Sequence, residues 1–138
     1  MGQQQLLLLV LGIVIVGLAV VVGIQAFSEN QQKANLDAMV NDGVRIASDL
    51  QAWSLKPQAF GGPASGEGIT DAEFADLGYD TDASGNYINL NGSYTLASGV
   101  IEGTGVQNTD NKVQITVTGA SPDSITTVTT ANGTFPSE

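Results

Sequence analysis

Residues 6–24 read LLLLVLGIVIVGLAVVVGI, nineteen consecutive residues without a charged or strongly polar side chain. The first charged residue of the chain is Glu29. A run of about eighteen or more apolar residues is long enough to cross the hydrocarbon core of a membrane, roughly 30 Å thick, as a helix. Residues 1–27 are therefore predicted to form an apolar helical arm that lies either in lipid or in the dry interior of an assembly.

The residues behind the arm, 28–138, are predicted to form one small globular head. They number about 110, enough for one compact domain with a modest core. Residues 28–55 continue the helix in amphipathic form, because apolar side chains recur at steps of one, three and four residues. The apolar face comprises Leu36, Met39, Val40, Val44, Ala47, Leu50 and Trp53. The residues expected to face water are Asp37, Asp42, Arg45 and Asp49.

A connector over residues 56–85 and a β-meander over residues 86–138 complete the head. Glycine and proline end the helix, and the connector is rich in glycine, proline and aspartate. Within it, Thr70–Glu73 has the spacing of a capping box, which predicts one short helical turn. Three or four antiparallel strands are expected, with a turn at Asn91-Gly92. The strand candidates are 87–90, 94–96, 100–106, 113–118 and 125–129. The expected fold class is α+β, a long N-terminal helix packed on a small antiparallel sheet.

The composition argues against several classes of function. Acidic residues outnumber basic ones 14 to 4, and the net charge of −10 repels nucleic acid phosphates. The chain has no histidine and no cysteine, so it lacks the usual acid–base catalyst, the usual transition-metal ligands and any disulfide. We expect no catalytic residues, no metal site, no cofactor and no direct binding of nucleic acid.

The start at Met1, the uncharged apolar segment behind it, the helix that becomes amphipathic near residue 28 and the small β head resemble type IV pilins, the subunits of thin bacterial surface filaments. The resemblance implies cleavage by a prepilin peptidase just before Met1, and N-methylation of Met1. It also implies a stay in the inner membrane, and then assembly by the pilus machinery into an extracellular helical filament of identical subunits. The residues implied in filament assembly are Met1, Gln5, Leu6, Gly12, Gly17 and Gly23.

Two features of the arm bear on this resemblance, its lack of basic residues and its three glycines. No Lys or Arg precedes Lys33, so the arm lacks the basic flank of a signal peptide or an ordinary anchor, and we expect that a basic leader once preceded Met1. The three glycines permit close helix packing and weaken the helix by about 1 kcal/mol each. We therefore expect an interruption of the helix in the filament between Gly12 and Gly23, centred on Gly17. The alternative is a continuous helix, because without proline every residue of the arm keeps its N–H.

The chain departs from the family pattern in three ways. Gln5 stands where most members have Glu, the kinking proline of the arm is absent, and the head has no disulfide. Archaeal pilins also start with glutamine-containing segments such as Gln3-Gln4-Gln5, although the connector and meander favour the bacterial branch. The alternative function is a single-pass, membrane-anchored extracytoplasmic binding module.

Three short motifs have a second interpretation as ordinary turns. Residues 80–85, DTDASG, begin like a calcium loop, but the twelfth position holds Asn91 in place of the required Glu. Asn91-Gly92-Ser93 and Asn132-Gly133-Thr134 match the N-glycosylation pattern and also match Asn-Gly turns, which is the favoured interpretation.

Overall fold

A single long helix begins the fold, as the sequence predicts. The computed structural model describes residues 2–136, and α1 spans Gly2–Ser54 without a break at any of the three arm glycines. The chain divides into two compact units, one up to Lys33 and the other from Ala34 onward. The first unit is helix alone, and the second holds the rest of α1 and the sheet.

The helical part of the second unit turns one face toward the sheet. Its buried residues are Met39, Gly43, Ile46, Ala47, Leu50 and Trp53. Val44, expected on this face, is 38 % exposed, which corrects that assignment. Gly43 takes its place, because a Cβ at Gly43 would meet Cδ1 of Ile115 at 2.3 Å. The helix therefore lies closer to the sheet at Gly43 than an alanine there would allow without movement of Ile115.

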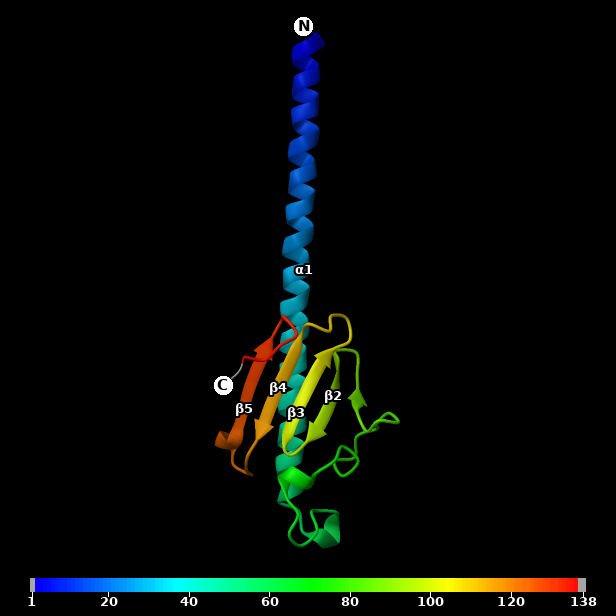
Figure 1. Cartoon of the computed structure of the whole chain (residues 1–138), viewed down its shortest axis with the longest axis vertical. Helices are drawn as coiled ribbons and strands as arrows, with labels where there is room; N and C mark the ends of the chain where they lie inside the picture. Colours follow the sequence, from blue (N-terminus) through cyan, green and yellow to red (C-terminus); the bar gives the residue numbers. More distant parts are fainter. Residues whose placement is uncertain (1, 137–138) are drawn as a thin grey trace. The chain divides into compact units, whose positions relative to one another are not determined.

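The sheet has five antiparallel strands in the order β1-β2-β3-β4-β5, so the expected meander is confirmed and the expected number of strands is too low (Figure 1). The strands are β1 (Tyr87–Ile88), β2 (Gly92–Ala97), β3 (Val100–Gly105), β4 (Lys112–Val117) and β5 (Ile125–Thr130). Each pairs with its neighbour in sequence, so every connection is short. Only two residues form β1, which is therefore a short edge strand.

Two tight turns set the register at the start of the sheet. Ser98 and Gly99 join β2 to β3 with φ angles of 52° and 76°, the positive values of a two-residue hairpin turn. The turn expected at Asn91-Gly92 lies slightly earlier, because Gly92 already belongs to β2. The side-chain oxygen of Asn89 closes this turn by accepting the backbone N–H groups of Asn91 (2.9 Å) and Gly92 (3.0 Å).

The connector contains two short 3₁₀ helices, η1 (Gln58–Phe60) and η2 (Ile69–Asp71). The turn expected to begin at Thr70 begins earlier, because Asp71 accepts the backbone N–H of Gly68 at 3.0 Å. A third, η3 (Pro122–Ser124), lies between β4 and β5, where a turn was expected. The connector contributes Ala72 and Phe74 to the core.

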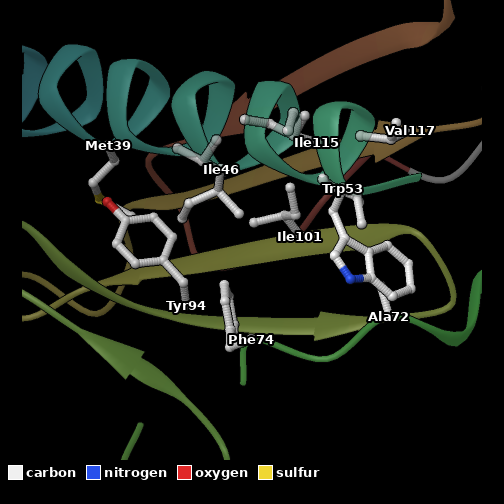
Figure 2. Packing of buried hydrophobic residues seen from close by; sticks show 12 residues of the cluster. Met39, Ile46, Trp53, Ala72, Phe74, Tyr94, Ile101, Ile115 and Val117 are labelled. Carbon is white, nitrogen blue, oxygen red and sulfur yellow. The ribbon is translucent and has the colours of Figure 1, made fainter. Parts of the chain in front are cut away.

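The core lies between α1 and one face of the sheet (Figure 2). In β4, Val113, Ile115 and Val117 are buried, and the residues between them are only half-buried, so the strand alternates as a sheet with one covered face should. Figure 2 shows Met39, Ile46 and Trp53 of the helix directed toward this face. The residues on the other face of β2, β3 and β4 are half-buried or exposed.

Candidate functional site

The apolar surface of the arm is the most prominent feature of the first unit. Every residue from Leu6 to Ile24 is exposed, and its large side chains range from 52 % exposed at Val14 to 70 % at Leu7. Within residues 2–136, α1 is the one helix long and apolar enough to cross a membrane, with a mean hydropathy of 3.2 in its most apolar window. The arm is thus compatible with a membrane anchor, as the sequence predicts.

Burial of this surface is strongly favourable. Fully burying one Val, Leu or Ile side chain contributes about 1.5–3 kcal/mol. Residues 6–24 present fifteen such side chains. Moving all of them from water into an apolar environment is therefore favourable by on the order of 20 kcal/mol or more. Contact of the arm with an apolar environment is therefore strongly favoured over its exposure to water.

Of the residues expected to take part in filament assembly, those that the structure describes all lie on α1. Gln5 and Leu6 are exposed on the first turns of α1. A Cβ added at Gly12, Gly17 or Gly23 would meet no atom within 4 Å, so these glycines are notches open to an approaching helix. Met1, expected to carry the N-methyl group, lies outside the described residues.

A polar cluster in the head was not anticipated. Oδ2 of Asp42 accepts three hydrogen bonds, from Nδ2 of Asn89 (2.8 Å), Nδ2 of Asn91 (2.7 Å) and the hydroxyl of Tyr94 (3.1 Å). Asn35 extends the cluster by donating to the backbone carbonyl of Asn91 at 3.0 Å. The expectation that Asp42 faces water is therefore wrong: it is half-buried and ties α1 to the β1–β2 turn.

The helical period contains a signal for this cluster. Asn35, Met39, Asp42 and Ile46 follow one another at steps of four, three and four residues. This spacing places all four on the same face of the helix. The partners lie at least 47 residues away along the chain, so the sequence alone does not indicate what satisfies the carboxylate. The cluster is structural, since its hydrogen bonds join α1 to the β1–β2 turn and to β2.

Four aromatic rings pack in series beside this cluster. The ring centroids are 5.8 Å apart for Phe74 and Tyr79, 4.7 Å for Tyr79 and Tyr87, and 6.0 Å for Tyr87 and Tyr94. Burial, together with a hydrogen bond to Asp49 at 2.5 Å, raises the pKa of Tyr79 to about 12. Burial and the charge of Asp42 also raise the pKa of Tyr94 above its ordinary value.

These tyrosines predict a loss of head stability at alkaline pH. Their folded pKa values lie above the ordinary value of about 10, so the fold favours the neutral phenol. Their stabilisation is complete below about pH 10 and falls as the pH rises toward 12. Unfolding followed by Trp53 fluorescence at a series of pH values should show this fall. Tyr79→Phe should reduce the slope, and a slope unchanged by Tyr79→Phe would contradict the assignment.

The calcium-like motif is a turn closed by its own backbone. Oδ1 of Asp82 accepts the N–H groups of Ser84 (2.8 Å) and Asn86 (2.9 Å). These hydrogen bonds lower the pKa of Asp82, and the one from Asn86 has the largest effect. A carboxylate oxygen engaged in this way has less capacity for a metal ion.

We predict that this loop does not bind calcium tightly. The twelfth carboxylate is missing, and one oxygen of Asp82 is already occupied. Calorimetry of the full chain in detergent should detect no binding tighter than about 10⁻⁴ M. A micromolar calcium site that Asp82→Asn abolishes would contradict this prediction.

No group of three or more carboxylates suited to a metal ion occurs among residues 2–136. A surface hollow of about 470 Å³ is lined by five hydroxyl side chains, among them Ser54 and Ser98, and by Gly68, Ile69 and Val117. Two smaller hollows each contain a single carboxylate, Glu73 in one and Glu102 in the other. The candidate functional surface is therefore the arm.

Comparison with family models, curated proteins and solved structures finds no match to this chain.

Proposed function

We propose that this protein is the structural subunit of an extracellular filament of the type IV pilus class, assembling through its N-terminal apolar helix. The observation that carries the proposal is the exposed apolar surface of residues 6–24 on one unbroken helix. The same helix continues into a folded head, so an assembly of arms would display one head for each subunit. In this proposal the protein is not an enzyme, and its partners are further copies of itself, the inner membrane before assembly, and the assembly machinery.

The charge distribution supports assembly through the arm. All fourteen acidic residues and all four basic residues lie in the head, residues 28–138, which therefore carries the whole net charge of −10. Heads of equal charge repel one another, and the repulsion grows as they crowd together. Association must therefore draw its free energy from the neutral arm, and the charged heads remain in solvent.

The glycine notches favour arm-to-arm packing over a lone anchor. A helix surrounded by lipid gains nothing from Gly12, Gly17 and Gly23, each of which costs about 1 kcal/mol against alanine. Between helices the same positions allow close approach of neighbouring backbones. The alternative, a single-pass anchor for an extracytoplasmic binding module, explains the length of the arm without explaining its glycines.

Mechanical shearing of cells that make the protein separates the two functions. A filament subunit is released from the cells and appears as thin filaments by electron microscopy, with this chain of 14.2 kDa as the main protein by mass spectrometry. A single-pass anchor stays with the membrane fraction until detergent is added.

Replacing Val16 by Asp places a charge in the middle of the arm and should abolish the filaments, whereas Val16→Ile should preserve them.

The role of Gln5 is tested by two substitutions. A glutamine in the dry core keeps one acceptor and two donor hydrogens without a charge to desolvate. We expect Gln5→Glu to assemble, because the family's usual residue is acidic. Gln5→Leu removes every hydrogen-bonding group and should lower the yield of sheared filaments. Equal yields from Gln5→Leu and the unaltered chain would show that residue 5 makes no essential hydrogen bond.

A further inference from the structure

Two tripeptides, Asn91-Gly92-Ser93 and Asn132-Gly133-Thr134, fit the acceptor pattern for N-glycosylation. Sequence alone treats them alike, because both also fit Asn-Gly turns. The structure places them in very different surroundings. The difference lies in what the asparagine amide contacts and in whether the segment is held between strands.

The first tripeptide is part of the folded head. The amide nitrogen of Asn91 donates to Asp42 at 2.7 Å, and its backbone carbonyl accepts from Asn35 at 3.0 Å. Ser93 lies within β2, which pairs with β1 on one side and β3 on the other. An enzyme that must draw Asn91 and Ser93 into a cleft would have to open the sheet.

The second tripeptide lies beyond the last strand, and Asn132 and Thr134 are exposed. The side-chain oxygen of Asn132 accepts the backbone N–H (3.3 Å) and the hydroxyl (3.2 Å) of Thr134. Within residues 2–136 its amide nitrogen donates no hydrogen bond. One backbone bond, from the N–H of Gly133 to the carbonyl of Asp110 (2.8 Å), joins the tripeptide to the neighbouring loop. The hydroxyl of Thr130, the last residue of β5, also donates to the side-chain oxygen of Asn132, and the backbone N–H of Asn132 donates to that hydroxyl (3.3 Å).

We propose that Asn132 is an acceptor site for an N-linked oligosaccharide and that Asn91 is not. The donor is an oligosaccharide carried on a polyisoprenyl diphosphate. The amide nitrogen of Asn132 attacks C1 of the first sugar, the bond from C1 to the phosphate oxygen breaks, and the lipid diphosphate leaves. The amide nitrogen gives up one proton to a base of the transferase, so the step requires no oxidant or reductant.

The proposal rests on the proposed function in one respect. An extracytoplasmic head, held at the membrane by its arm before assembly, lies on the side where lipid-linked oligosaccharides are transferred to proteins. The Thr134 hydroxyl is already within hydrogen-bond distance of the acceptor side chain, so the segment needs little rearrangement to present both groups.

In the test, the full chain in detergent is incubated with a purified single-subunit oligosaccharyltransferase and a lipid-linked oligosaccharide, and the products are mapped by peptide mass spectrometry. We expect transfer to Asn132 to exceed transfer to Asn91 by about tenfold or more, because Asn91 reacts only after local opening of the head. Thr134→Ala should reduce transfer to Asn132 to background. Ser93→Thr makes the two tripeptides identical and should leave the preference for Asn132.

Peptides covering residues 87–97 and 126–136 serve as unstructured references and should be modified at similar rates. Equal transfer to Asn91 and Asn132 in the folded chain would overturn the proposal, as would an unmodified Asn132 in a chain whose 126–136 peptide is modified. The reaction uses the solubilised chain and does not depend on filaments. A modified Asn132 in a protein that never forms filaments would therefore count against the proposed function alone.

Discussion

Removal of residues 1–27 is expected to convert a chain that requires detergent, lipid or other arms into a soluble monomer. The fragment 28–138 loses the whole apolar surface of residues 6–24 and keeps the complete core between α1 and the sheet. About 110 residues with one such core are enough for independent folding. Circular dichroism should show both helix and strand, and gel filtration should show one copy per particle.

The matched measurement is made on the full chain after detergent is withdrawn, when it should form filaments or aggregates at the same concentration. Two results would contradict the division of roles between arm and head. One is assembly of the fragment 28–138 into filaments, which would place the assembly surface on the head. The other is an unfolded fragment, which would show that the head depends on the arm for its structure.

The largest destabilisation of the head by a single polar substitution is expected at Asp42. Replacing it with alanine leaves the amides of Asn89 and Asn91 and the hydroxyl of Tyr94 without their acceptor. Each buried polar group left unsatisfied costs about 1–3 kcal/mol, and partial exposure of the cluster reduces the sum. We expect Asp42→Ala to lower the free energy of unfolding of the fragment 28–138 by about 3 kcal/mol.

Two controls accompany this substitution in urea titrations followed by Trp53 fluorescence, the signal of the only tryptophan. Asp37 is exposed on the same helix, so Asp37→Ala removes an equal charge without these contacts and should change stability by less than about 0.5 kcal/mol. Tyr94→Phe removes one of the three bonds and should cost about 1 kcal/mol. Similar losses for Asp42→Ala and Asp37→Ala would show that the charge matters and the cluster does not.

Local patterns were sufficient to predict most of the architecture. The helix was expected over residues 2–55 and spans Gly2–Ser54, because its apolar run and its 3.6-residue period are both continuous. The last strand was expected over residues 125–129 and spans Ile125–Thr130, because β-branched residues fill it between two turns. These elements depend on residues close together in sequence, so the sequence reveals them.

The errors concern contacts between distant residues. Asp42 looks like a solvent-facing carboxylate until Asn89, Asn91 and Tyr94 are brought to it by the fold. Gly43 is buried in place of the exposed Val44 because Ile115 of β4 lies directly against the helix there. Neither partner can be identified from the helix alone, so the facing of these positions could not be predicted.

The central claim is that the arms of many copies form the interior of a filament. A side-chain-resolution reconstruction of sheared filaments tests this most directly. We expect residues 6–24 of neighbouring subunits to pack together around the axis, with Gly12, Gly17 and Gly23 at close helix contacts and the acidic heads outside. A filament in which residues 6–24 lie on the outer surface, or in which heads form the core, would contradict it.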